Sequence, residues 1–244
     1  MTFDRVRNSV WIDDPSLDAA EYQRARISMA RWNRFTGIAD GLYRQIARYQ
    51  IAHRGRRPLR VLDVSTGNGD LAVRWAVQAA RHRCDLHITS VDPNAHSIAE
   101  QQRLAKQSQV EVQSVQLDCI ASPLPCGFDV VVCSMLMHRL DEAQAFRLLQ
   151  SIQFSAQQAV IVCDLNRSRL NHALVKLASR LCTRSHVYRH DAVAGIQAAF
   201  SEQEISRIAQ SALARPIQLR PLFPCHFLLV ADETVDPVVA SAFA

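Results

Sequence analysis

Between residues 59 and 163 strand-like runs alternate with helical segments. The predicted strands cover 59–64, 87–91, 110–117, 128–133 and 159–163, of which 128–133 and 159–163 are the most apolar, and amphipathic patterns cover 69–80, 95–105 and 141–152. Runs that stay apolar at successive positions are typical of strands buried on both faces. The pattern therefore predicts an α/β fold, with helices covering both faces of a mostly parallel sheet.

Further elements are predicted on either side of this core. Helical patterns at 18–35 and 38–51 precede it, and the first opens with Asp18 and Glu21 at capping-box spacing. Helices at 168–182 and 201–213 follow it, and two strands at 217–220 and 226–230 close the chain. The short link between these strands is typical of antiparallel neighbours. We expect a helical extension at 1–55 that covers the substrate and one main domain at 56–244.

The composition is typical of a globular protein. The chain has 244 residues, of which 48% are apolar and 21% are charged, and its net charge of +5 is mild. The seven cysteines are scattered and form no CxxC or Cys/His cluster, so we expect no metal site and a reducing, cytoplasmic location. The opening MTFDRVRNSVWIDD lacks an apolar core, so we expect no signal peptide. No run approaches the ~20 apolar residues of a membrane span.

The segment VLDVSTGNGDLA, residues 61–72, carries the most chemical information. A predicted strand ends near Asp63, a turn of small residues passes Gly67 and Gly69, and a helix follows. Glycines allow a ligand to approach the backbone, and open α/β sheets bind ligands at this end of their strands. The turn also satisfies the dinucleotide pattern G-x-G-x-x-A, so by itself it leaves a nicotinamide-dependent oxidoreductase open.

Acidic residues at three successive strand ends distinguish a dinucleotide ligand from a ligand that carries a positive charge. Asp63 lies inside the turn motif, where it would repel a pyrophosphate and attract an ammonium or sulfonium group. Asp92, in SVDPN, is placed to accept hydrogen bonds from ribose hydroxyls, and Asp118, in QLDC, from an adenine amino group. Three carboxylates in this arrangement suit an adenosine that carries a positive charge. The simpler interpretation is that they only cap turns.

The segments VLDVSTGNGD, SVDPN, QLDC and FDVVVCSMLMHRLDE follow one another between about residues 59 and 145. Together they resemble the class I S-adenosylmethionine-dependent methyltransferases, and SMLMHRL is similar to the branch with quinone and other small-molecule enzymes. WIDDPSLDAAE and DLNRSRL…YRHD…AAFSEQE resemble small bacterial natural-product methyltransferases. The resemblance implies a Rossmann-like, doubly wound sheet of seven strands with an antiparallel last strand. It also implies S-adenosylmethionine as the cofactor and a small aromatic, phenolic or quinone-like acceptor.

The same resemblance assigns residues to the cofactor. Asp63 would anchor the methionine end, and the glycines would line the cofactor. Ser65 departs from the usual glycine, which puts the approach of the methionine moiety in question. The full predicted set is Asp63, Ser65, Gly67, Gly69, Asp92 with Pro93 for the ribose, Asp118 with Cys119 for the adenine, and Ser134 and Met135 facing the methionine and methyl group.

His138 is the candidate catalytic residue, because it follows the fourth of the predicted strands and imidazole is a common general base. It could instead only shape the pocket. In YRHD, His190 is a second polar candidate for the substrate, while Asp191 is interpreted as a helix N-cap.

Apolar and aromatic side chains near these positions are candidates for an acceptor pocket. Trp32, Phe35 and Met137 are predicted to contact the substrate, with Trp11 as a further candidate, although residues of this kind more often belong to the core.

The 165–190 segment combines a leucine stripe with six basic residues. A substrate lid, a subunit contact and a membrane-surface helix are all compatible with it, and the simplest interpretation is a helix packed on the domain.

Three other functions remain open. An NAD(P)-dependent oxidoreductase is supported by GNGDLA alone, and no Y-x-x-x-K pair accompanies it. An rRNA or other nucleic-acid methyltransferase is compatible with the net charge, but CSML stands where base-amine enzymes have N/D-P-P-aromatic. A catalytically silent binding module is the third. We expect a small-molecule partner and no nucleic acid, while the oligomeric state and the acceptor atom stay open.

Overall fold

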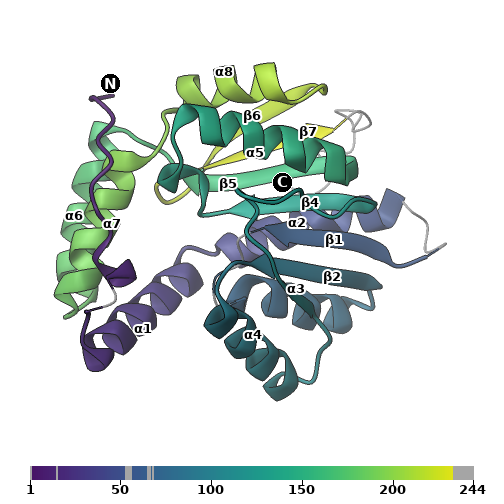
Figure 1. The fold of residues 1–244 in the computed structure, drawn as a ribbon, viewed down its shortest axis with the longest axis horizontal. Helices are drawn as coiled ribbons and strands as arrows, with labels where there is room; N and C mark the ends of the chain where they lie inside the picture. The colour runs from purple at the N-terminus through teal and green to yellow at the C-terminus, as the bar shows by residue number, and fades with distance from the viewer. Residues whose placement is uncertain (1, 15, 53–56, 65–66, 68, 233–244) are drawn as a thin grey trace.

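The computed structural model describes residues 2–14, 16–52, 57–64, 67 and 69–232, without the side chains of residues 13, 30, 33–35 and 52. A seven-stranded sheet with the order β3-β2-β1-β4-β5-β7-β6 forms its centre (Figure 1). Its strands are β1 (Leu59–Val64), β2 (Leu86–Asp92), β3 (Gln113–Gln116), β4 (Phe128–Ser134), β5 (Ala156–Leu165), β6 (Ile217–Leu222) and β7 (His226–Asp232). β7 runs antiparallel to both of its neighbours, and β1 to β5 are parallel. The predicted sheet of seven strands with an antiparallel last strand is confirmed.

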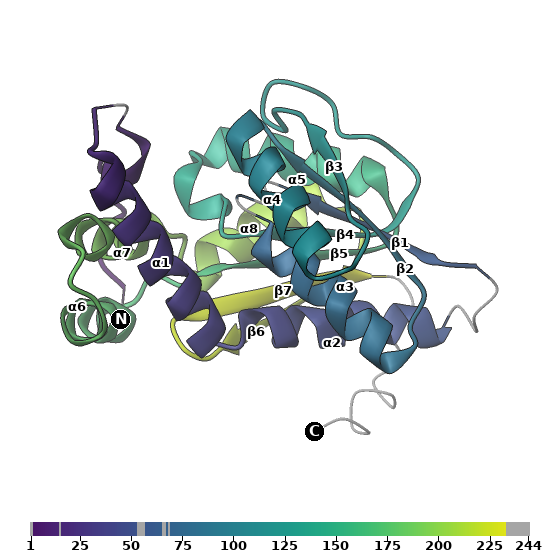
Figure 2. The same ribbon diagram turned by 90° about the horizontal axis from the view of Figure 1, so that it is seen from below.

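Helices cover both faces of this sheet (Figure 2). α2 and α3 pack on one face, with α4 beside α3, and α5 and α8 pack on the other. The helices are α1 (Ala19–Phe35), α2 (Ile38–Ala52), α3 (Asp70–His82), α4 (Ala95–Gln107), α5 (Glu142–Ser155), α6 (Arg169–Cys182), α7 (His186–Ala198) and α8 (Glu202–Ala212), with 3-10 turns η1 (Trp11–Asp13) and η2 (Met137–Arg139). None of these described helices combines the length and apolar character that crossing a membrane requires.

β4 illustrates why the central strands are apolar at every position. Val130 and Val132 face the helices α2 and α3, whereas Val131 and Cys133 face α5 and α8. All four side chains are fully buried. Because side chains alternate between the two faces of a strand, only an unbroken apolar run can fill both cores.

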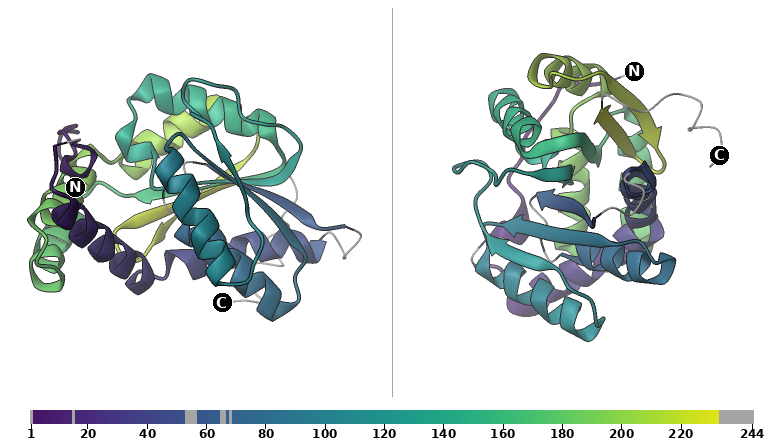
Figure 3. Two further views of the ribbon diagram at one scale, coloured as in Figure 1. Left: turned by 60° about the horizontal axis from the view of Figure 1, so that its bottom comes forward. Right: turned by 90° about the vertical axis from the view of Figure 1, so that its right-hand side faces the viewer.

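The remaining helices form a separate layer beyond the carboxyl ends of the strands. α6 packs on α7, and α1 also packs on α7, so that the three lie together at one end of the molecule (Figure 3). Residues 3–14, which we call the N-terminal segment, run along α7. We refer to α1, α6, α7 and this segment as the cap. α2 packs on the sheet instead, and the predicted division at residue 55 stays a prediction.

Several predicted boundaries differ from the structure, and three of the differences have a physical reason. β3 starts at Gln113 rather than 110, because the amide of Val110 closes the end of α4 by donating to Ala105 O. β6 continues through Pro221, which an edge strand tolerates because one side of it needs no N–H donor. α7 begins at His186 with Ser185 as its N-cap. The N-cap role predicted for Asp191 is therefore wrong.

Candidate functional site

A cavity of about 1350 Å³ lies between the carboxyl ends of the strands and the cap. Its floor includes Gly67, Asp92, Ser134 and Leu165, each of which follows or ends a strand. Its roof comes from the N-terminal segment and from α1, α6 and α7, with the residues Arg7, Asn8, Ser9, Val10, Ile12, Asp14, Ala19, Tyr22, Arg26, Met29, Trp32, Val175, Ser179, Tyr188, Asp191, Ala192, Ala194, Gly195 and Ala198. Because parallel strands end at one edge, residues far apart in the sequence meet here.

The glycine turn after β1 lies at one end of the cavity. Gly67 adopts a left-handed φ of +56°, and a Cβ on it would meet no atom within 4 Å. Gly69 has a φ of +70°, and a Cβ there would come within 2.3 Å of Gln101 Cγ on α4. Gly69 is thus required by packing and backbone conformation, whereas Gly67 leaves open space on the cavity side.

Asp92 links the second strand to this turn. Its carboxylate accepts hydrogen bonds from Gly67 N at 2.8 Å and from Asn94 N at 2.9 Å. Burial raises the pKa of Asp92, and the two amides oppose that shift. Asp63 is the next-to-last residue of β1 and has no exposed surface. Two of the predicted carboxylates therefore lie at neighbouring strand ends.

The third predicted carboxylate has a different environment. Asp118 is exposed and accepts from Ile120 N at 2.9 Å and Ala121 N at 3.3 Å, so it caps a turn after β3. Cys119 beside it is buried, and burial raises the pKa of its thiol to about 11. Neither side chain lines the cavity within the described part of the chain. Ser65 lies outside the described residues.

His138 on η2 forms a close pair with Asp164 at the end of β5. Nδ1 of His138 lies 2.7 Å from Asp164 Oδ1. The same carboxylate accepts from Met137 N and Leu165 N, both at 2.6 Å, and it has no exposed surface. Burial alone would raise the pKa of Asp164, but the imidazole and these hydrogen bonds hold that pKa below its usual value. A fixed, ionised carboxylate thus orients the imidazole.

The edge of the His138 ring that does not contact Asp164 is directed toward α7. A Cβ on Gly195 would lie 3.8 Å from His138 Cδ2 and 3.9 Å from Nε2, and only 3.0 Å from Leu165 Cδ1. Both His138 and Gly195 line the cavity. With Nδ1 engaged by Asp164, Nε2 is the nitrogen available to a ligand. This geometry is the one expected of a general base.

Ser134 ends β4 and Met135 follows it on the cavity floor. Met135 has a left-handed φ of 57°, and its amide donates to Cys163 O at 2.9 Å. Both residues line the cavity together with Pro93. Met137 is completely buried and belongs to the core on the α5 side, so the structure does not bring it to the cavity.

The predicted substrate contacts in the cap are only partly brought together. Trp32 on α1 lines the cavity. Phe35 ends α1, and its side chain lies outside the described residues. His190 on α7 instead stacks on Trp11, with ring centroids 3.7 Å apart and planes within 5°.

Asp191 has a role that the sequence did not suggest. Its carboxylate accepts from Trp11 N and Ile12 N, both at 2.9 Å, in the N-terminal segment. It therefore caps η1 from the middle of α7. Because Asp191 Oδ1 also lies 2.9 Å from His190 Nδ1, the YRHD motif holds the roof of the cavity together.

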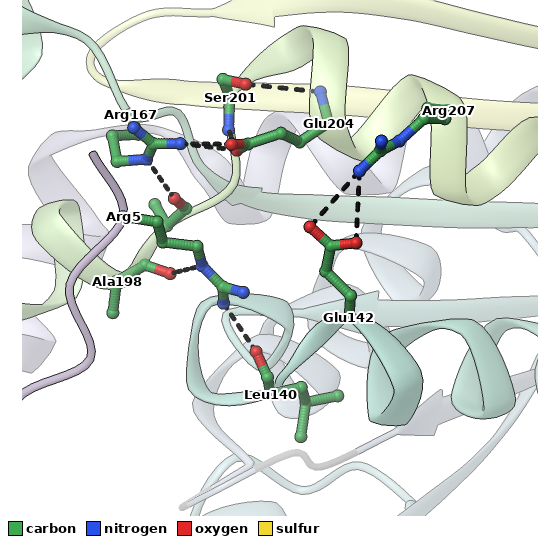
Figure 4. A network of polar contacts seen from close by, with 9 residues as sticks. Arg5, Leu140, Glu142, Arg167, Ala198, Ser201, Glu204 and Arg207 are labelled. Carbon is green, nitrogen blue, oxygen red and sulfur yellow. Dashed lines mark hydrogen bonds and ion pairs between the residues drawn. The ribbon is translucent and has the colours of Figure 1, made fainter. Parts of the chain in front are cut away.

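Arg5 fixes the other end of the N-terminal segment (Figure 4). Its Nε donates to Ala198 O and its Nη2 to Leu140 O, both at 2.6 Å. The guanidinium also lies 3.6 Å from the centroid of the Phe200 ring. The segment is thus tied to α7 and to the loop after η2.

A second group of contacts in Figure 4 secures the start of α8. Ser201 and Glu204 form a complete capping box, and the buried Arg167 donates to Glu204 at 2.5 and 2.7 Å. These contacts hold α8 against the loop that follows β5. The cap and the sheet are therefore joined by polar contacts at several points.

Sequence reasoning missed Asp164, Gly195 and Arg5. Asp164 had a usable signal, because it follows the apolar run AVIVC as Asp63 and Asp92 follow theirs. Gly195 had a weaker one, since an isolated glycine in a helical pattern often marks close packing. Arg5 had none, because its partners lie 135 and 193 residues away.

The chain matches one family model. Residues 61–158 match a model described as a methyltransferase domain. This stretch runs from β1 into β5 and contains the glycine turn, Asp92 and His138. No curated protein sequence matches the chain.

Solved structures of methyltransferases share the fold over most of the chain. The plantazolicin methyltransferase BpumL, solved with SAH, has a TM-score of 0.68 at 12% identity and covers 92% of this chain and 93% of its own. The magnesium protoporphyrin IX methyltransferase of Synechocystis PCC 6803, also with SAH, has a TM-score of 0.57 at 14% identity, with 91% and 90% covered. A putative O-methyltransferase of Nostoc punctiforme PCC 73102 has a TM-score of 0.61 at 18% identity, with 86% and 59% covered. At these identities the likeness shows the fold.

Proposed function

We propose that this chain, which carries a methyltransferase domain at residues 61–158, transfers the methyl group of S-adenosylmethionine to a small acceptor whose proton is taken by the His138–Asp164 pair. One observation carries the proposal: His138, which Asp164 holds from behind, and the Gly67–Asp92 turn line a single cavity. The cavity volume of about 1350 Å³ exceeds the roughly 300–1000 Å³ typical of one ligand. It therefore suits a cofactor and an acceptor together.

The residues around the glycine turn fit S-adenosylmethionine. Gly67 leaves room for a ligand, and a buried carboxylate at Asp92 can accept from two ribose hydroxyls. Asp63 adds negative charge at the end of β1, which favours an ammonium or sulfonium group. Ser134 and Met135 would contact the methionine portion. When bound, the cofactor supplies a methyl group already activated for displacement.

The other end of the cavity suits a flat, largely apolar acceptor. Trp32, Met135, Leu165, Val175 and Tyr188 contribute apolar or aromatic surface, and His138 contributes one basic nitrogen. Pockets with a few polar groups among apolar walls select ligands of matching polarity. A phenolic or quinol hydroxyl that donates to His138 Nε2 would lose its proton as the new bond forms. The protein otherwise contributes alignment and exclusion of water.

Binding of the cofactor product tests the first half of the proposal. S-adenosylhomocysteine should raise the melting temperature and bind in calorimetry, because a ligand that binds only the folded state stabilises it. Asp92→Ala should weaken this binding by about ten- to a hundredfold, the equivalent of ~1.5–3 kcal/mol for a charged hydrogen-bonding group. Asp85→Ala, at the opposite end of β2, is the matched control and should bind like the wild type. Binding of NADH in place of S-adenosylhomocysteine would refute the proposal.

A further inference from the structure

α6 presents an apolar stripe to solvent on its outer side. Leu170, Leu174, Leu177 and Leu181 recur at intervals of four, three and four residues, which places them along one face of a helix. Their exposed fractions are 68%, 39%, 59% and 77%. α6 lies at the outer edge of the molecule in two perpendicular views (Figures 1 and 2). Four neighbouring leucines exposed in this way form a surface suited to an apolar partner.

The opposite side of the same helix is part of the enzyme's interior. Val175 and Ser179 are buried, with exposed fractions of 6% and 3%, and both line the main cavity. The hydrophobic stripe is therefore a second, separate apolar face. The packing of α6 on α7 does not explain it.

Basic residues flank the stripe, and the same stretch of the sequence contains no acidic residue. Residues 166–190 contain six Arg or Lys side chains and no Asp or Glu. Arg167 is bound to Glu204, and Arg189 donates to Thr183 O. The other four, Arg169, Lys176, Arg180 and Arg184, are exposed. The first three share one flank of α6, about 100° around the helix from the leucines.

A small cavity of about 330 Å³ lies beside this flank, between α6, α7 and the N-terminal segment. Lys176, Arg180 and Arg189 line it together with Asn8, Ser179 and His190. Its described lining contains no carboxylate. Three cations and several hydrogen-bond donors at one concave surface suit a phosphate group.

We propose that α6 docks on an anionic lipid surface, with its leucines in the boundary between headgroups and acyl chains and lipid phosphates at Lys176 and Arg180. An amphipathic helix with a basic polar face is the form that binds such surfaces. A second copy of the chain fits less well, because a two-fold contact through this stripe would bring two basic flanks together without acidic partners. The docking itself does not depend on the proposed methyl transfer. If both hold, the wall of the acceptor site lies against the bilayer, where apolar acceptors dissolve.

Vesicle co-sedimentation of the full chain tests the docking without cofactor or acceptor. We expect binding to vesicles of phosphatidylcholine with phosphatidylglycerol, weak binding to phosphatidylcholine alone, and loss of binding at high salt. Leu177→Glu/Leu181→Glu should abolish binding. Lys176→Ala and Arg180→Ala should each weaken it by about fivefold and together by roughly 25-fold.

Phe154→Glu is the matched control, because Phe154 is 83% exposed on α5, away from the cap. It should bind vesicles like the wild type, and circular dichroism should show that all variants are folded. Absence of binding to the anionic vesicles, or equal binding to both kinds, would overturn the proposal. A dimer in analytical ultracentrifugation that Leu177→Glu/Leu181→Glu dissociates would overturn it too, and would assign the stripe to a second copy.

Discussion

At the scale of single residues, the chemistry depends on a buried carboxylate behind an imidazole. Asp164 accepts from two backbone amides and lies 2.7 Å from His138 Nδ1. This arrangement selects the tautomer of His138 that leaves Nε2 free to accept a proton. An asparagine at 164 could not accept at both oxygen positions, so it would break one of these contacts.

Asp164→Asn should therefore lower methyl transfer as strongly as His138→Ala, by about a hundredfold or more, with S-adenosylhomocysteine affinity nearly unchanged. The measurement is transfer from methyl-labelled cofactor to a panel of phenols, quinols and hydroxylated polyketides. Because the two residues act as a unit, the double variant should be no slower than either single one. A double variant that multiplies the two losses would show that the residues act independently.

The same carboxylate has a predictable effect on acid stability. Its pKa is lowered in the folded protein, so its stabilising contribution is fully present above the usual pKa of about 4 and is lost as the pH falls through the lowered value. The difference in unfolding free energy between the wild type and Asp164→Asn should therefore be largest near neutral pH and shrink in acid.

At the scale of elements, α8 on the sheet and α7 in the cap both begin with side-chain hydrogen bonds to their first amides. α8 begins with the capping box of Ser201 and Glu204, and Arg167 joins that box to the end of β5. α7 begins at His186 after its N-cap Ser185, while its middle holds η1 through Asp191. Capping hydrogen bonds between near neighbours and hydrogen bonds between residues far apart in the sequence therefore stabilise the same helices.

Ser201→Ala should lower the unfolding free energy by about 1 kcal/mol, because the hydroxyl satisfies the amide of Glu204 at the start of α8. For a chain of this size, this corresponds to a melting temperature lower by roughly 2–4 °C. Ser211→Ala is the control on the same helix, since its exposed hydroxyl only donates to Arg207 O and its loss should change stability by under about 0.5 kcal/mol. Equal melting temperatures for the two variants would contradict the prediction.

Local sequence patterns predicted the helices and strands well, but they did not predict which side chains meet across long distances in the sequence. The individual strands, the glycine turn and the capping box of α8 follow from spacing within about ten residues, and the structure contains them, whereas the seven-stranded sheet is what the family resemblance implies. Asp191 was misread because an acidic residue near the start of a helical pattern resembles an N-cap, whereas its partners lie 180 and 179 residues away. Met137 was likewise placed by its neighbours in SMLMH, but η2 turns it into the core. The pairing of His138 with Asp164 required the order of β4 and β5 in space.

At the scale of the whole molecule, the cavity has two walls that come from different parts of the chain. The floor belongs to the sheet, and the roof is tied to it by Arg5, which contacts both α7 and the loop after η2. The N-terminal segment is therefore held by polar contacts together with the stacking of Trp11 on His190, and we expect it to open locally more easily than the sheet unfolds.

Arg5→Ala should make the N-terminal segment at least about tenfold more sensitive to limited proteolysis, since it loses charged hydrogen bonds of roughly 1.5–3 kcal/mol. The acceptor KM should rise, while S-adenosylhomocysteine affinity stays near the wild-type value. Arg207→Ala is the control, because its ion pair with Glu142 is exposed and such pairs contribute ~0–1 kcal/mol. If both variants are cleaved at the wild-type rate, Arg5 does not hold the segment.

The hydrogen bonds between the N-terminal segment and α7 can form only after both parts of the chain have been translated. Val6 N donates to Gln197 O, so this hydrogen bond cannot form until a residue 191 positions later has been translated. At about 5–20 residues per second this delay is roughly 10–40 s. During that time β1 to β5 can already pair, because all of them precede α7 in the chain. The strands of the cavity floor are thus all translated before α7 can complete the roof, and a nascent chain can meet the cofactor before it can enclose an acceptor.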